Sequence, residues 1–88
     1  MDNEIGAELP RYRCHKQVWA LKIRWVEAHA NGSAALCPED ETYAPVEVDA
    51  VFVTKHLPKN GGYYVVYDDG YKSFSPAAAF ENGYTRIA

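Results

Sequence analysis

The sequence predicts a small α+β domain, with an antiparallel sheet of about four to five strands and one or two short helices. Three observations lead to this class. Apolar and charged residues alternate towards the end of 18–27, a dense run of tyrosine and valine occupies 63–67, and helix-start residues open predicted helices at 50–57 and 76–82. With 88 residues, the chain has room for one hydrophobic core.

The first ten residues differ from the rest of the chain. Residues 1–10 are polar, lack periodicity and end in a proline. We therefore expect a flexible leader there, followed by a single α+β domain over residues 11–88.

The first predicted strand leads into a hairpin. Leu21, Ile23 and Trp25 fall on one face of an undistorted strand, so we expect Trp25 in the core. Asn31-Gly32 tolerates positive φ and predicts a turn into a second strand at 34–37.

The middle of the chain predicts a short strand at 45–48 and then a helix. Asp49 is a suitable N-cap, and Pro58 would stop the helix after Leu57. Apolar residues also alternate from 46 to 52, which suits a strand. We favour the helix.

The segment that follows predicts a second hairpin whose register is open. A two-residue Asp69-Gly70 turn pairs Val65 with Phe74, whereas a three-residue loop with Gly70 in the left-handed region pairs Tyr64 with Phe74. The two registers place every tyrosine of the hairpin on opposite faces.

A short helix and a last strand complete the predicted fold. Ser75 is expected to cap the helix, with Pro76 at its first position. Gly83 would end it in the left-handed conformation, and residues 84–87 would return as a strand.

Composition excludes several classes of function. The net charge of −3 argues against binding duplex DNA, and no apolar run approaches the roughly 20 residues of a membrane span. Cys14 and Cys37 lack the spacing of a metal site and are expected to be reduced. No nucleophile–base pattern occurs either. We therefore expect no enzyme, metal or cofactor.

The aromatic content points to a binding role. A domain this small cannot fully bury all of its rings, and interfaces favour tyrosine, although the same rings also suit the edge of a core. The candidate contact residues on the second hairpin are Tyr63, Tyr64, Tyr67 and Tyr71. A second candidate set, suited to a nucleotide or an anionic peptide, is His15, Lys16, Trp19 and Arg24.

Several blocks of the sequence resemble a known family. They are YRCHK, followed by Val18 and ALKI, within 12–25, and GGYYVVYDDGYKSFSPAAAF with ENGYTRI within 61–87. This pattern is similar to a family of small uncharacterised proteins of tailed phages and prophages. The resemblance implies a phage accessory protein in the cytoplasm of a bacterial host, and carries no site residues.

Together these observations predict a non-enzymatic phage protein that antagonises a host defence system by occluding a protein surface. A homo-oligomer is compatible with this role. One alternative is an oligomeric sponge that sequesters a nucleotide signal. The other is a virion or assembly component.

Overall fold

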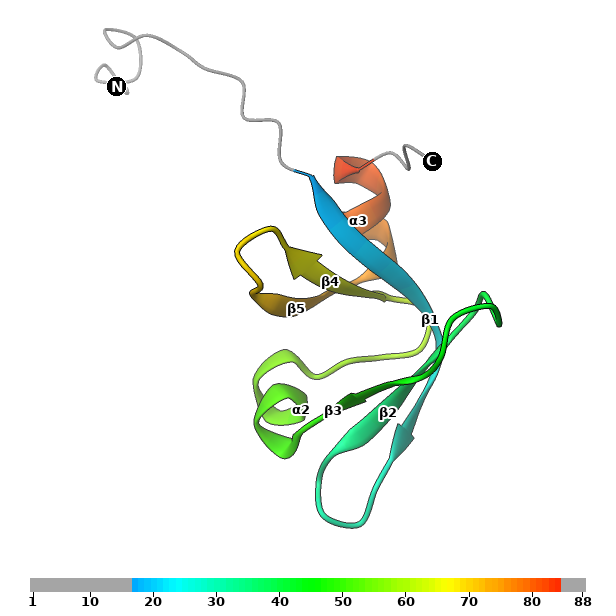
Figure 1. Cartoon of the computed structure of the whole chain (residues 1–88), viewed down its shortest axis with the longest axis vertical. Helices are drawn as coiled ribbons and strands as arrows, with labels where there is room; N and C mark the ends of the chain where they lie inside the picture. The colour runs from blue at the N-terminus through cyan, green and yellow to red at the C-terminus, as the bar shows by residue number, and fades with distance from the viewer. Residues whose placement is uncertain (1–16, 85–88) are drawn as a thin grey trace, which may run out of the picture.

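The computed structural model describes residues 17–84 and shows a curled, five-stranded antiparallel sheet with two short helices (Figure 1). The strand order is β3-β2-β1-β4-β5, which confirms the predicted class. The elements are β1 (Val18–Ala28), β2 (Ala34–Pro38), β3 (Val46–Val48), α2 (Ala50–His56), β4 (Tyr63–Tyr67), β5 (Lys72–Ser75) and α3 (Ala77–Gly83). The predicted leader at 1–10 lies outside the described residues, as does the predicted last strand apart from Tyr84.

The long central strand β1 holds the two halves of the sheet together. It pairs with β4 through its first half and with β2 through its second half. Between Ile23 and Trp25 the register with β2 shifts by one residue, as at a β-bulge. Val26 therefore packs against the core opposite Leu36, while Trp25 is 46% exposed. The prediction of a core Trp25 is wrong because it assumed unbroken alternation.

The core lies on the inner, concave side of the sheet. Its buried residues come from three strands: Ile23, Ala34, Leu36 and Val48. Partly buried side chains from α2, β4 and β5 complete it, notably Phe52, Val53, Tyr64 and Phe74. Residues distant in sequence therefore meet at one apolar centre.

Helix α2 forms as the N-cap signal predicted. The Asp49 carboxylate accepts a hydrogen bond from the backbone N–H of Phe52 at 2.8 Å. Leu57 ends the helix in the left-handed conformation, at φ 49°, directly before Pro58. The helical interpretation of this segment is confirmed.

The second hairpin adopts the three-residue loop. Gly70 has φ +91°, and the Tyr67 backbone N–H donates to the Tyr71 carbonyl at 2.9 Å. Tyr64 consequently pairs with Phe74. This register turns Tyr64 towards the core and leaves Tyr63 on the opposite face.

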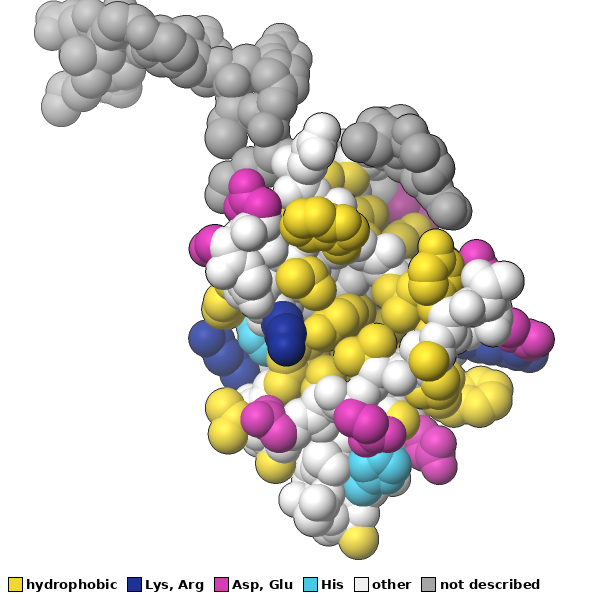
Figure 2. Space-filling model, in the orientation of Figure 1, with side chains coloured by type: hydrophobic (Ala, Val, Ile, Leu, Met, Phe, Trp, Pro, Cys, Tyr) yellow, Lys and Arg dark blue, Asp and Glu magenta, His cyan; other side chains and the backbone are white. Residues whose placement is uncertain are grey.

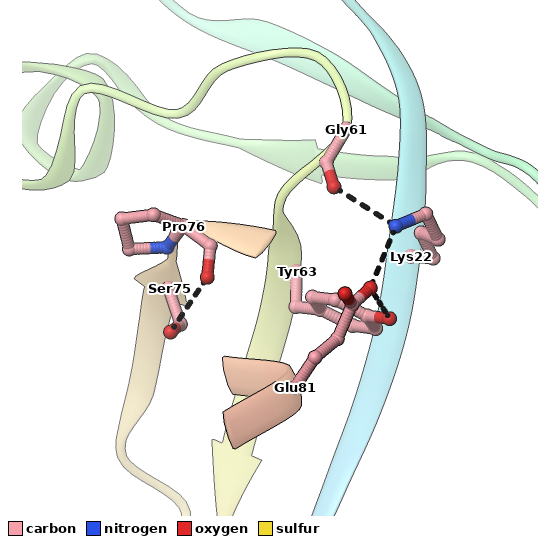
Figure 3. Close-up of polar contacts among 6 residues, drawn as sticks. All are labelled: Lys22, Gly61, Tyr63, Ser75, Pro76 and Glu81. Carbon is pink, nitrogen blue, oxygen red and sulfur yellow. Dashed lines mark hydrogen bonds and ion pairs between the residues drawn. The ribbon is translucent and has the colours of Figure 1, made fainter. Parts of the chain in front are cut away.

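Helix α3 begins and ends differently from the prediction. Pro76 is the N-cap, and Ser75 remains the last residue of β5, paired with Tyr63. The Ser75 hydroxyl is directed to the Pro76 carbonyl at 3.3 Å and caps no N–H of the helix (Figure 3). Gly83 is the last helical residue, without a positive φ, and Tyr84 leaves the helix in an extended conformation.

Candidate binding surfaces

The two faces of β4 separate the predicted tyrosines. Tyr64 and Val66 lie on the inner face, and Tyr63, Val65 and Tyr67 lie on the outer face, because successive side chains of a strand alternate. The four tyrosines therefore do not form one continuous surface. Helix α2 packs near the inner face, and helix α3 packs on the outer face.

Helix α3 covers part of the outer face. The ring of Phe80 stacks on the ring of Tyr63, with centroids 4.2 Å apart. Val65, on the same face, is 2% exposed although it does not belong to the inner core cluster. Val65 is therefore buried apart from the inner core cluster, on the face of β4 that carries α3, which the sequence did not predict.

A polar network fastens α3 to the sheet (Figure 3). The Glu81 carboxylate accepts hydrogen bonds from the Tyr63 hydroxyl at 2.8 Å and from Lys22 Nζ at 3.1 Å. Lys22 Nζ also donates to the Gly61 carbonyl at 3.2 Å and lies 4.8 Å from the centre of the Tyr63 ring. Tyr63 is thus committed to internal contacts on both its ring and its hydroxyl.

The network shifts the pKa of each member. The hydrogen bonds from Tyr63 and Lys22 lower the pKa of Glu81 below its usual range. The hydrogen bond to Glu81 raises the pKa of Tyr63, and a hydrogen bond to the same carboxylate raises the pKa of Lys22. All three shifts favour the charged acid, the charged amine and the protonated phenol, so the network is electrostatically consistent at neutral pH.

Tyr64 belongs to the edge of the inner core. It is half-buried, and its ring lies 6.0 Å from that of Phe52 in α2. Burial raises the pKa of its hydroxyl. This tyrosine therefore matches the alternative interpretation, an amphipathic ring that completes the core.

Tyr67 and Tyr71 flank the hairpin loop, where Tyr67 is half-buried and Tyr71 is exposed. Their ring centroids are 5.9 Å apart, and Tyr71 is 45% exposed. The His56 ring approaches Tyr71 edge-on at 6.1 Å, and Lys55 Nζ lies 5.3 Å from the same ring. The C-terminal turn of α2 thus joins the hairpin in one exposed aromatic and basic surface.

A hollow of about 300 Å³ lies beside this surface. We use the name α2–β5 seam for five of its lining residues, Phe52, Lys55, His56, Tyr64 and Lys72. The hollow extends to β3 and the start of α2 through Glu47, Val48, Asp49 and Val51. Figure 2 shows basic side chains and a histidine gathered beside apolar surface in this part of the molecule.

Sequence reasoning missed the seam. Lys55 and Lys72 are separated by a loop and a whole strand, and only the packing of α2 near β5 places them in one hollow. No spacing or motif in the chain marks this pair.

The structure does not bring Arg24 to Trp19. Trp19, 65% exposed, lies near the start of β1 opposite Val66. Arg24 lies five residues further along, about 16 Å at the usual strand rise. It forms an ion pair with Glu41 at 3.4 Å and lies over the Trp25 ring. The other two members of this predicted set, His15 and Lys16, lie outside the described residues.

Within residues 17–84, no group of three or more His, Cys, Asp or Glu side chains is arranged to hold a metal ion. Cys37 is a free, half-buried thiol, and Cys14 lies outside the described residues. Neither helix of the described region has the length and apolar character needed to span a bilayer.

Comparisons with known proteins give one structural neighbour of clear relevance. No protein-family model matches the chain, and no curated protein matches it. The chain is similar to the monomeric form of the phage L decoration protein, solved by NMR, with 32% sequence identity and a TM-score of 0.62. The match covers 77% of this chain and 50% of that protein, so the chain spans about half the length of its neighbour. This similarity supports the phage relationship that the sequence indicated.

Proposed function

We propose that this chain is a non-enzymatic component of a phage particle and binds the capsid as a decoration protein. The supporting observation is its similarity, in both sequence and fold, to the phage L decoration protein. Of the functions that the sequence predicted, this is the virion alternative. It requires a protein partner and no catalytic group.

The arrangement of the domain suits such a role. A sheet of five strands provides a rigid support, the exposed Lys55 and Lys72 line the seam, and the exposed ring of Tyr71 lies beside Lys55. Binding through preformed side chains on a rigid support costs little conformational entropy. Synthesis and attachment to new particles would take place in the cytoplasm of the bacterial host.

The other two predicted functions have less support. The structural neighbour is a decoration protein, which does not favour antagonism of a host defence system. A nucleotide sponge requires a concave pocket, and the hollow beside α2 is partly open to solvent and carries the carboxylates of Glu47 and Asp49. A carboxylate-lined wall repels phosphate groups.

Particle binding tests the proposal directly. Purified chain would be mixed with particles of the phage that encodes it, and separately with phage L particles lacking their own decoration protein, and then sedimented. We expect saturable co-sedimentation with the first and detection of the chain by mass spectrometry in purified virions. A size-matched acidic domain is the control. Absence from virions together with no co-sedimentation would reject the proposal.

A further inference from the structure

We infer that the α2–β5 seam binds acidic side chains of a protein partner, through Lys55 and Lys72 together with the rings beside them. The inference rests on the proposed function, under which that partner is the capsid protein. It specifies which surface of the domain makes the contact and what the capsid must present to it.

The first argument is that neither lysine of the seam forms an ion pair with a described residue. In the described part of the chain, the ion pairs join Lys22 to Glu81, Arg24 to Glu41 and His29 to Glu47. Lys55 and Lys72 have no acidic partner among residues 17–84. Two ammonium groups thus line one hollow, and neither is bound to a carboxylate of residues 17–84.

The two acids that also line the hollow already have partners. Glu47 Oε1 lies 3.0 Å from His29 Nε2, and the Asp49 carboxylate caps α2 through the Phe52 N–H. Neither carboxylate forms an ion pair with a lysine of the seam. The lysines are therefore available to an external carboxylate.

The second argument is the aromatic surface beside these charges. Lys55 Nζ lies over the Tyr71 ring, and the His56 ring meets both Tyr71 and Phe52. Such rings pack against the methylene groups of a bound Asp or Glu and exclude some water, which strengthens the charge pair relative to one on an open surface. Aromatic residues at an interface also contribute contact area at low entropic cost.

The third argument is charge complementarity. The chain as a whole carries a net charge of −3, and the two acids that share the hollow with Lys55 and Lys72 are held by His29 and by the N-terminus of α2. Complementary patches of this kind orient a partner as it approaches and select the correct face. An acidic partner would be attracted to these two lysines.

Carboxylates fit this seam better than phosphates. The seam has no arginine, and α2 presents its last turn, which holds Lys55 and His56. The C-terminal end of a helix carries partial negative charge. With Glu47 and Asp49 in the same lining, the hollow tolerates a single negative charge more readily than the denser charge of a phosphate.

The test uses neutral substitutions and a matched control. Lys55→Gln/Lys72→Gln removes both charges, and Lys55→Glu/Lys72→Glu reverses them. Lys59→Gln and Lys59→Glu are the controls, because Lys59 is an exposed lysine outside the hollow. Circular dichroism checks that each variant is folded. Co-sedimentation with phage particles gives an apparent Kd at low and at physiological salt.

We expect the neutral double variant to bind on the order of tenfold more weakly at low salt, with less effect at physiological salt, and the reversed variant to lose binding. The Lys59 variants should bind like the wild type. Wild-type binding that the seam variants leave unchanged would overturn this inference and leave the proposed function intact. Failure of the wild type to bind would overturn both. A seam-dependent thermal shift with nucleotides, without an effect on particle binding, would instead identify a phosphate site.

Discussion

The two faces of β4 are stabilised in different ways. On the inner face, aliphatic residues from β1, β2 and β3 meet at a centre from which water is excluded, with Ile23 and Leu36 at 1% and 0% exposure. On the outer face, a two-turn helix close in sequence covers Val65 through a ring stack and a partly exposed polar network. The inner face therefore depends on long-range packing, and the outer face on a local, more easily opened covering.

The largest expected loss of stability comes from a substitution on the inner face. Leu36→Ala should lower the free energy of unfolding by about 2–5 kcal/mol, because it removes a fully buried side chain and leaves a cavity. Urea denaturation followed by circular dichroism measures the loss. Val51→Ala is the matched control, since Val51 is 73% exposed on α2. Equal costs for the two variants would contradict the assigned core.

A smaller effect is expected on the outer face. Phe80→Ala removes the stack on Tyr63 and should cost about 1–2 kcal/mol, because the ring is only half-buried. Hydrogen exchange should accelerate in α3 far more than in β2, which would show local opening. Tyr43 is an exposed aromatic residue of the 39–45 loop, so Tyr43→Ala should change neither the free energy of unfolding nor the hydrogen exchange of α3. Uniform acceleration across β2 and α3 would mean that the two faces open together.

The smallest expected loss of stability comes from Glu81→Gln, and this loss depends on pH. The pKa of Glu81 is lowered in the folded protein. The ionised Glu81 therefore stabilises the fold at pH values above the ordinary glutamate pKa of about 4.3, and this stabilisation is lost as the pH falls through the folded pKa. Tyr63 and Lys22 have raised pKa values, so their contributions are lost above about pH 10. The network is therefore complete between these limits.

Melting temperatures at pH 3 and pH 7 measure this contribution. Glu81→Gln should narrow the difference in Tm between the two pH values, whereas Glu27→Gln, at an exposed position of β1, should leave it unchanged. An unaltered difference in Glu81→Gln would show that the network adds nothing to the attachment of α3.

The predicted site and the observed surfaces overlap only in part. Tyr63 is used to hold α3, and Tyr64 to complete the core, while Tyr71 remains exposed beside Lys55. Residue type alone indicated an excess of aromatic rings. It could not indicate which rings the helices would cover, because that depends on where α2 and α3 pack.

The sequence by itself determined the local elements. The cap at Asp49 and the valine–tyrosine run of β4 act within a few residues, so their outcomes could be deduced from neighbouring positions. The sequence also placed a turn before Tyr71, but it left the loop length open, and the structure decided for the three-residue loop with Gly70 in the left-handed region. The predicted helix cap at Ser75 was wrong for a reason outside its immediate neighbours. Ser75 pairs with Tyr63 as the last residue of β5, so the helix begins after it, with Pro76 as the N-cap.

Only the tertiary structure decided what depends on distant partners. The bulge that turns Trp25 outwards and Val26 inwards arises in the pairing of β1 with β2. The network of Lys22 with Glu81 spans 59 positions of the chain, and the seam joins a helix to an edge strand. Such contacts depend on the packing of the whole domain, so no local pattern in the sequence records them.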